Sequence, residues 1–285
     1  MRPLRIATRA SALALAQARW VGERLTAAHP GIAVTLVEVT TTGDADRISA
    51  VTTLTEVGAF VRSVQMAVLT DDADLAVHSC KDLPVAGPEE LTVFFPERES
   101  PWDVLCGGTL DSLPPRARVG TGSPRRTAQL AALRPDLVID GIRGNVETRL
   151  GKVASGEFDA IVLAEAGLNR TDARHAIAQR FSVSEMVPAP AQGALAVEVM
   201  SGSQAAELVT ALDHGPTRNA VEAERSLLAR TGAGCRAALG ALAAVDGDAF
   251  TMHGFVEDVG GARRAQVRDS DSAKASRLLQ EALGL

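Results

Sequence analysis

Residues Leu75 to Pro84 read LAVHSCKDLP, and this short stretch decides the architecture that we expect for the chain. The apolar run Leu75-Ala76-Val77 predicts a buried strand, and Pro84 stops it because proline cannot donate to a sheet ladder. Lys81 and Asp82 therefore fall on a turn just past the carboxyl end of a strand, where open α/β sheets bind ligands. A lone Lys-Asp pair is more often a solvated turn, so the rest of the chain has to decide whether Asp82 is functional.

The segments around this turn alternate between strand-like and helical patterns. The expected elements are a strand Leu4–Thr8, a helix Ala12–Ala28 capped by Ser11, a strand Ile32–Val39, a helix Phe60–Leu69 and a strand Leu91–Phe95. Strands alternating with helices in this way predict an α/β fold, with a mostly parallel sheet covered by helices on both faces.

A charged segment bounded by prolines, Pro96–Pro101, ends this first series, and a second series follows. It contains strand-like Val104–Cys106, Arg118–Gly120, Leu137–Ile139 and Ala160–Leu163, with helices from Pro124 and after Asn145. A second proline segment, Pro188–Gly193, leads to Leu195–Val199, a strand that can complete the first sheet. Two such crossings predict two lobes joined by a double hinge, with a cleft that can close on a ligand.

The remaining residues predict a small α+β domain. Its expected elements are helices near Thr217–Arg230 and Ser272–Leu283 and β-like segments Gly240–Val245 and Phe250–Val256, and a helix near Gln204–Leu212 precedes it in the first domain. The predicted boundaries are therefore 1–96 with 191–213 for the first domain, 100–188 for the second and 215–285 for the third.

The composition argues against a nucleic-acid-binding protein, a membrane-spanning protein and a metal site. A chain of 285 residues with 46% hydrophobic residues and a net charge of −6 lacks the basic face of a nucleic-acid binder, and its aromatic content of 3% leaves few stacking platforms. No apolar run reaches the ~18 residues of a membrane helix, and the early ALALAQA is interrupted by charge and reads as a packed helix rather than a signal peptide. Three separated cysteines fit a reducing compartment, so we expect a cytoplasmic protein. The five scattered histidines predict no metal site.

Arginine is concentrated in the second series. Residues 116–149 hold seven Arg, no Lys and three acids, a local excess of +4 in a chain of net charge −6. Guanidinium groups pair bidentately with carboxylates or phosphates, so this excess predicts an anionic ligand.

The arginines also stand at expected helix starts. Arg125 and Arg126 follow the cap Ser123, Arg143 and Arg149 flank the cap Asn145, and Arg9 precedes the cap Ser11. Cations oppose the helix dipole there unless an anion binds at the same end. Phosphate-binding motifs are absent, and separated arginines suit a ligand with several carboxylates. A lone Asp82 among them can accept N–H donors or stabilise a developing cation.

Cys235 lies in TGAGC, a glycine-rich segment after a helix. A thiol there can be exposed and reach a neighbouring domain, although an isolated cysteine is usually a buried hydrophobe.

Nine motifs, in this order and spacing, resemble those of the porphobilinogen deaminase (hydroxymethylbilane synthase) family. They are ATRASALALAQA, VTTTGDADR, GAFV, VHSCKDLP, VGTGSPRR, RGNVETRL, DAIVLAEAGLNR, PAPAQGALAVE and AERSLLARTGAGC, and the resemblance extends over residues 4 to about 240.

The resemblance implies a transferase that joins four porphobilinogen molecules head to tail, releases ammonia and yields hydroxymethylbilane for tetrapyrrole and haem synthesis. It implies a dipyrromethane cofactor held by a thioether to Cys235, with Asp82 as the catalytic carboxylate. It also implies two lobes like those of periplasmic binding proteins plus a small third domain, and a monomer. The carboxylate-binding and supporting residues that it implies are Arg9, Ser11, Lys81, Ser123, Arg125, Arg126, Arg143 and Arg149, with Phe60, Ser79, Thr121 and Gln192 in support.

Two rival interpretations stay open at this point. A non-catalytic two-lobed binding protein or regulator for a polycarboxylate also predicts clustered arginines, but gives no reason for Asp82 together with Cys235. A family member that has lost activity would keep the same motifs.

Overall fold

The computed structural model describes residues 2–39, 55–231, 238–246 and 249–285, and divides the chain into two compact units. Unit 1 comprises Met1–Arg98 and Ala194–Arg218, and unit 2 comprises Glu99–Gly193 and Asn219–Leu285. The chain therefore leaves unit 1 in the first proline segment and returns to it after the second, as the two predicted crossings require. The boundaries predicted for three separate domains remain a prediction.

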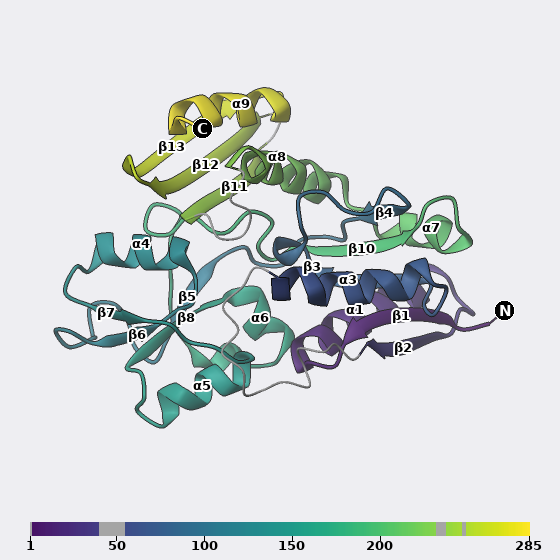
Figure 1. Cartoon of the computed structure of the whole chain (residues 1–285), viewed down its shortest axis with the longest axis horizontal. Coiled ribbons are helices and arrows are strands. Elements are labelled where there is room, and N and C mark those ends of the chain that lie inside the picture. Colours follow the sequence, from purple (N-terminus) through teal and green to yellow (C-terminus); the bar gives the residue numbers. More distant parts are fainter. Residues whose placement is uncertain (1, 40–54, 232–237, 247–248) are drawn as a thin grey trace. The chain divides into compact units, whose positions relative to one another are not determined.

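Unit 1 is built on a five-stranded mixed sheet in the order β2-β1-β3-β10-β4 (Figure 1). Strands β1 (Leu4–Arg9), β2 (Val34–Val39) and β3 (Leu75–Ser79) are parallel. Strand β10 (Leu195–Met200) is antiparallel to both β3 and β4 (Leu91–Phe94). The strand after the second hinge thus completes the first sheet, which confirms that prediction.

Side chains of the strands point alternately to the two faces of the sheet, and helices pack against both faces. Leu4 and Ile6 of β1 pack with Leu25 of α1 (Ala12–Ala28) on one face. Ala7 packs with Val64 of α3 (Thr55–Leu69) on the other. Successive side chains of a strand point to opposite faces, so both faces of this sheet are covered. The unit continues with η1 (Cys80–Asp82), α7 (Gln204–Val209), η3 (Thr210–Leu212) and the start of α8 (Gly215–Thr231).

Unit 2 contains a second five-stranded sheet, in the order β7-β6-β8-β5-β9. Its elements are β5 (Asp103–Cys106), β6 (Arg118–Gly120), α4 (Pro124–Leu133), β7 (Val138–Asp140), α5 (Val146–Ala154), β8 (Ala160–Ala164), α6 (Glu165–Arg170), η2 (Arg174–Ala176) and β9 (Ile177–Arg180). Strands β6, β7 and β8 are parallel, whereas β5 runs against β8 and β9. The α/β class predicted for both series is confirmed.

The last part of unit 2 is an antiparallel sheet, β11 (Ala238–Asp246), β12 (Ala249–Asp258) and β13 (Gly261–Asp269), covered by α9 (Ser272–Leu283). Leu227 of α8 and Leu279 of α9 are fully buried in its core with Met252. The predicted α+β character of this segment is confirmed, but strand β13 was not predicted.

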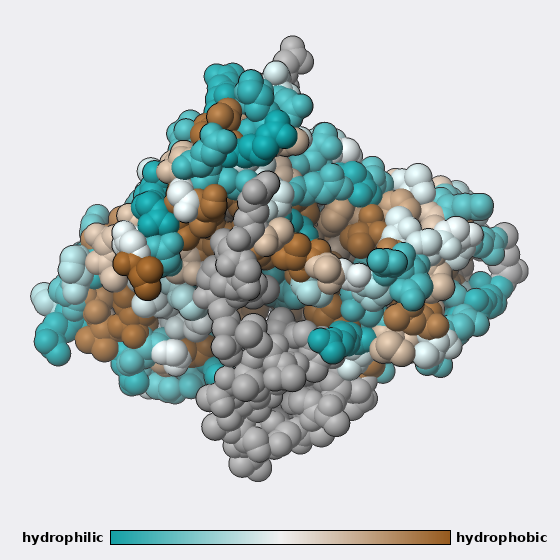
Figure 2. Space-filling view, turned by 45° about the horizontal axis from the view of Figure 1, so that its top comes forward, coloured by the Kyte–Doolittle hydropathy of each residue, from teal (hydrophilic) through white to brown (hydrophobic). Residues whose placement is uncertain are grey.

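Hydrophilic and hydrophobic residues are interspersed on the face shown in Figure 2. The large hydrophobic side chains exposed among the described residues come from different helices, strands and loops, namely Met66, Val85, Val138, Val245, Val259 and Leu278. Within the described ranges, no helix is long and apolar enough to span a membrane.

Candidate functional site

The turn after β3 holds the predicted catalytic carboxylate. Strand β3 ends at Ser79, and Cys80–Asp82 form one 3₁₀ turn that closes with the N–H of Leu83 donating to the carbonyl of Cys80 at 3.1 Å. The N–H of Cys80 donates to the carbonyl of Ala194, just before β10, at 3.0 Å. Cys80 is buried and Asp82 is exposed, so the turn is anchored in the sheet while its carboxylate faces outward. The position predicted for Lys81 and Asp82 is confirmed.

A cavity of about 270 Å³ in unit 1 is lined by Asp82, Arg9 and Ser11. Parallel strands β1 and β3 end at the same sheet edge, which brings Arg9, the last residue of β1, to the turn after β3. Ser11 caps α1, its hydroxyl accepting from the N–H of Ala14 at 3.3 Å, as predicted. The edge thus places one carboxylate, one guanidinium and one helix start around a small cavity.

Polar side chains that the sequence did not single out support this turn from both faces of the sheet. On the α1 face, the amide of Gln17 donates to the hydroxyl of Ser79 at 2.8 Å. On the α3 face, Nε2 of His78 lies 3.0 Å from Oε2 of Glu198, whose two oxygens each accept from the amide of Gln65 at 3.0 Å. Gln17 interrupts the apolar face of its helix, which was the one local signal that pointed to it.

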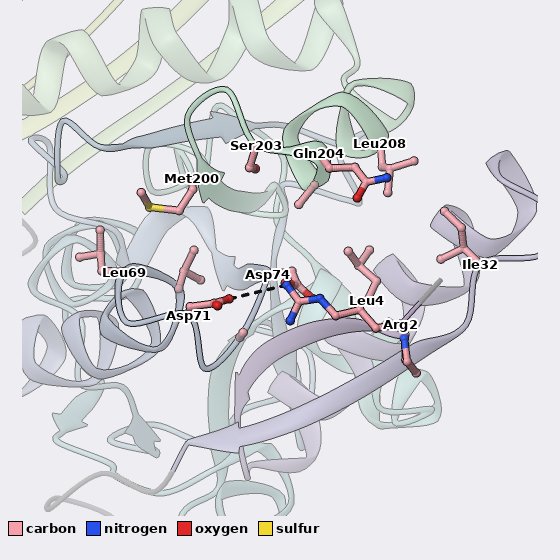
Figure 3. Close-up of a pocket in the computed structure, with 14 residues that line it drawn as sticks. Arg2, Leu4, Ile32, Leu69, Asp71, Asp74, Met200, Ser203, Gln204 and Leu208 are labelled. Atoms are coloured by element: carbon pink, nitrogen blue, oxygen red, sulfur yellow. Dashed lines mark hydrogen bonds and ion pairs between the residues drawn. The ribbon is translucent and has the colours of Figure 1, made fainter.

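A larger cavity of about 420 Å³ lies at the opposite end of the same sheet, where β1 begins (Figure 3). Its charged lining consists of Arg2, Asp71 and Asp74. Asp74 pairs with Arg2 at 2.8 Å and with Arg5 at 3.0 Å, and Arg5 also pairs with Asp71 at 2.6 Å. Two cations matched by two anions leave no excess charge for an ionic ligand, so we place the candidate site at the Asp82 end.

The corresponding sheet edge of unit 2 holds Arg125 and Arg126. Ser123 caps α4, accepting from the N–H of Arg126 at 3.5 Å, and both arginines lie in the first turn as predicted. Their guanidinium groups turn inward and each pairs with Asp103 at 2.7 Å. Arg125 and Arg126 also donate to the carbonyls of Val187 at 2.7 Å and Val162 at 2.9 Å.

Asp103 is fully buried, and its ionisation is set by these neighbours. Burial alone would raise the pKa of Asp103, but the charges of Arg125 and Arg126 outweigh it and hold that pKa well below its usual range. Burial lowers the pKa of Arg125, against the opposing charge of Asp103. Two guanidinium groups share one carboxylate, so the cluster keeps one excess positive charge that suits an anionic ligand. Asp103 was missed in the sequence, although it stands at the head of an apolar run.

Two further loops meet at this edge. Thr121 donates its N–H to the carbonyl of Asp140 at 2.9 Å, and a Cβ at Gly122 would lie 3.3 Å from the carbonyl of Ile142. The loop after β6 therefore packs against the loop after β7, which carries Arg143. Asn145 caps α5 as predicted, accepting from the N–H of Thr148 at 2.9 Å.

The two arginines of this second loop differ in their surroundings. Arg143 is exposed, whereas Arg149 donates from Nε to the carbonyl of Gly144 at 2.7 Å. Arg143 is therefore the arginine of this edge whose head group is most accessible to a ligand.

Side chains of unit 2 tie the second proline segment into that unit, and the carboxylate of Glu224 accepts from the N–H of Ala191 at 2.6 Å. Gln192 donates to Asp103 at 3.1 Å and to the carbonyl of Pro101 at 2.8 Å, so it joins the two hinge segments. Arg170, which the sequence did not single out, donates to the carbonyl of Gly193 at 2.8 Å, and burial lowers its pKa to about 10.

The predicted site residues thus fall into two groups within the described part of the chain. Unit 1 brings together Arg9, Ser11, Ser79, Lys81 and Asp82, and unit 2 brings together Thr121, Ser123, Arg125, Arg126, Arg143, Arg149 and Gln192. Cys235 lies outside the described residues, as does the side chain of Phe60. Within the described part of the chain, no group of three or more His, Cys, Asp or Glu side chains could hold a metal ion.

The chain is similar to known proteins of one family. A family model described as "Porphobilinogen deaminase, dipyromethane cofactor binding domain" matches residues 4–207. The porphobilinogen deaminase of Thermobifida fusca (strain YX) is 51% identical over 247 residues, covering 85% of this chain and 77% of that protein. That of Roseiflexus castenholzii is 43% identical over 278 residues, covering 96% of this chain and 91% of that protein.

A third relative, the porphobilinogen deaminase of Thermus thermophilus, is 47% identical over 253 residues, covering 87% of this chain and 82% of that protein. Among solved structures, a nutrient binding protein from Burkholderia cenocepacia bound to methionine is 12% identical, with a TM-score of 0.43, covering 75% of this chain and 93% of that one. The family model spans most of the chain, and the curated relatives share between two fifths and half of its residues. The chain belongs to the porphobilinogen deaminase family.

Proposed function

We propose that the chain joins four porphobilinogen molecules head to tail on a dipyrromethane primer, with Asp82 as the carboxylate at the reacting centre. The observation that carries this proposal is the unit 1 cavity, where Asp82 faces the same space as Arg9 and Ser11. A pyrrole presents an N–H donor and its acid side chains present carboxylates. In the cavity, the carboxylate of Asp82 can accept the pyrrole N–H, and Arg9 and Ser11 offer a cation and a hydroxyl to the carboxylates of the substrate.

Asp82 is suited to hold positive charge as it forms. When ammonia leaves porphobilinogen, the C–N bond breaks, nitrogen keeps the electron pair, and the pyrrole becomes cationic. A carboxylate that accepts the pyrrole N–H lies next to that charge and lowers the barrier electrostatically. Asp82 sits on a turn that is anchored through Cys80 and Ser79, so little reorganisation is needed as the charge appears.

Unit 2 fits the carboxylate-bearing cofactor. Arg125 and Arg126 exceed Asp103 by one positive charge, and Arg143 stands exposed at the same sheet edge. The residues that would hold the cofactor there are Thr121, Ser123, Arg125, Arg126, Arg143 and Arg149, with Gln192 holding Asp103 in place. Cys235 would attach it through a thioether. When bound, the dipyrromethane supplies the pyrrole carbon to which the first porphobilinogen is joined.

Arg9, Ser11 and Lys81 bind and orient the substrate. Arg9 ends β1 and Ser11 begins α1, so their polar groups are held by regular structure. An anchored guanidinium positions a carboxylate better than a mobile lysine does. Lys81, half-buried beside Asp82, adds a second cation.

The intact mass of the purified protein and the turnover of an Asp82 variant test this proposal. Active protein should carry the mass of two porphobilinogen units less two ammonia, and the addition should be lost in Cys235→Ala. Asp82→Asn should fold and keep the addition but turn over at least ~10²-fold more slowly. An unmodified mass after exposure to substrate, with binding of polycarboxylates, would instead indicate a non-catalytic binding protein.

We also expect the enzyme to act as a monomer in the cytoplasm, with no nucleic-acid or membrane partner. The net charge of −6 argues against nucleic-acid binding, the odd number of cysteines fits a reducing compartment, and the monomer rests on the family resemblance alone. Light scattering of the purified protein measures the oligomeric state directly.

A further inference from the structure

Three buried polar side chains lie behind the Asp82 cavity, and the reaction proposed above gives them no role. They are Gln65 of α3, His78 of β3 and Glu198 of β10, with relative exposures of 3%, 6% and 2%. His78 also lines the cavity itself, beside Asp82. We refer to these three residues as the triad.

The sheet register explains how the triad assembles. His78 pairs with Ala196 and Ala76 pairs with Glu198 on antiparallel neighbours, so His78 and Glu198 are diagonal neighbours on one face. Helix α3 covers that face and contributes Gln65. Nε2 of His78 lies 3.0 Å from Oε2 of Glu198, and the amide of Gln65 lies 3.0 Å from each carboxylate oxygen.

The triad is not what folding alone would select. Around it, the layer between the sheet and α3 is built from side chains without polar atoms, such as Ala76 of β3 and Val64 and Ala67 of α3. Burying a carboxylate costs several kcal/mol before its partners repay it, and an apolar replacement of similar volume is often neutral or stabilising. A buried His, Glu and Gln at one point of an apolar layer therefore calls for a role other than stability.

We propose that Gln65, Glu198 and His78 position Asp82. Gln65 holds the carboxylate of Glu198, which lies 3.0 Å from Nε2 of His78 without meeting hydrogen-bond geometry, and His78 is the last residue of β3 on the α3 face before the turn that carries Asp82. On the α1 face, the hydrogen bond from Gln17 to Ser79 holds the neighbouring residue. The turn is thus held from both faces, so the carboxylate keeps its place as charge develops. This inference rests on the proposed function, because it acts through Asp82.

Glu198→Gln is the most informative variant, since it keeps the volume and removes the charge that faces His78. We expect its kcat for porphobilinogen to fall by about 10- to 100-fold, the range for a misplaced reacting group, with KM within about 2-fold of wild type. Gln65→Met removes only the amide and should lower kcat by about 3-fold or more. If Glu198→Gln does not fold, Gln65→Met decides the question.

Asp74→Asn is the matched control. Asp74 immediately precedes β3 at the other end of the sheet, in the cavity of Figure 3, and accepts from the N–H of Arg5 at 2.8 Å. We expect this variant to lower the melting temperature while leaving kcat within about 2-fold of wild type. A Glu198→Gln or Gln65→Met enzyme with unchanged kcat, or one that loses kcat only in step with melting temperature as Asp74→Asn does, would refute the positioning role.

A second readout does not depend on turnover. The imidazole ¹⁵N resonances of His78, assigned by their loss in His78→Gln, should shift in Glu198→Gln and stay unchanged in Asp74→Asn. Unshifted resonances in Glu198→Gln would refute the contact on which the triad depends. Wild-type protein that does not turn over porphobilinogen would refute the proposed function and the inference with it, whereas active wild type with an equally active Glu198→Gln refutes the inference alone.

Discussion

Replacing Asp103 by Asn tests whether this carboxylate is the counter-charge of the two buried arginines. The substitution keeps the size of the side chain and an oxygen that Gln192 can reach, but it leaves Arg125 and Arg126 without a neutralising charge. Removing one partner of a buried ion pair costs about 3–5 kcal/mol, because the remaining charge stays buried. For a unit of roughly 160 residues each kcal/mol lowers the melting temperature by about 2–4 °C, so we expect a loss of about 6–20 °C.

Differential scanning calorimetry of the wild type and the variant at pH 7 measures this loss. Asp136→Asn is the control, because Asp136 pairs with Arg134 in the same unit but is partly exposed, and its melting temperature should match the wild type within about 2 °C. A melting temperature for Asp103→Asn within about 2 °C of the wild type would show that Asp103 does not neutralise the arginines.

The loss of stability in Asp103→Asn should also depend on pH, and it should become smaller only in acid. The pKa of Asp103 is held below its usual range in the folded protein, so its contribution is complete above the unfolded value of about 3.9 and is lost as pH falls through the folded value. The difference in unfolding free energy between wild type and Asp103→Asn should therefore be the same at pH 7 and pH 5 and shrink only below about pH 4. A difference that has vanished by pH 5 in urea titrations would contradict this order of pKa values.

Three other predictions concern single residues. Arg143→Ala removes an exposed head group assigned to the cofactor, so the fraction of purified protein that carries the cofactor mass should fall by about 10-fold with no change in melting temperature, and an unchanged fraction would remove Arg143 from the cofactor site. Gly193→Ala should lower the melting temperature by several degrees, because the new Cβ would lie 2.3 Å from the carbonyl of Glu99 and the backbone has a φ of +89°. Gly151→Ala in α5 is the control: a Cβ there meets nothing within 4 Å, so this substitution should be neutral or stabilising. Burial raises the pKa of the Cys106 thiol to about 11, so Cys106 should resist a thiol reagent at pH 8 until the protein is unfolded, and fast labelling of Cys106 itself in the native protein, located by peptide mass, would contradict its burial.

Features set by neighbouring residues could be predicted from the sequence. The caps Ser11, Ser123 and Asn145 each accept from an N–H three residues further on, and such bonds depend only on local backbone geometry. The turn at Asp82 follows equally from a short apolar run and the proline after it. The elements themselves were placed to within a few residues for the same reason.

The missed elements lack the patterns on which such predictions depend. Strand β13 reads GARRAQVRD, in which exposed Arg264, Gln266 and Arg268 alternate with Ala265 and Val267, which pack against the core, and it pairs with β12 along its whole length. Strand β9 has four residues at the edge of its sheet, and α6 has six. The secondary structure of such segments is determined by contacts with residues distant in the sequence, and local propensity does not predict those contacts.

The charge of Arg125 and Arg126 could be predicted from the sequence, but their partner could not. The local excess of positive charge near Arg125 and Arg126 was visible, and an anion was expected at their helix start. The anion that occupies this end is Asp103, about twenty residues earlier in the chain and brought there by β5, which runs antiparallel to β8. Because one carboxylate meets two guanidinium groups, the pairing reduces the excess without cancelling it. In a buried site of low dielectric the remaining charge still attracts an anion, so the arginines act mainly through their field while Arg143 remains the accessible contact.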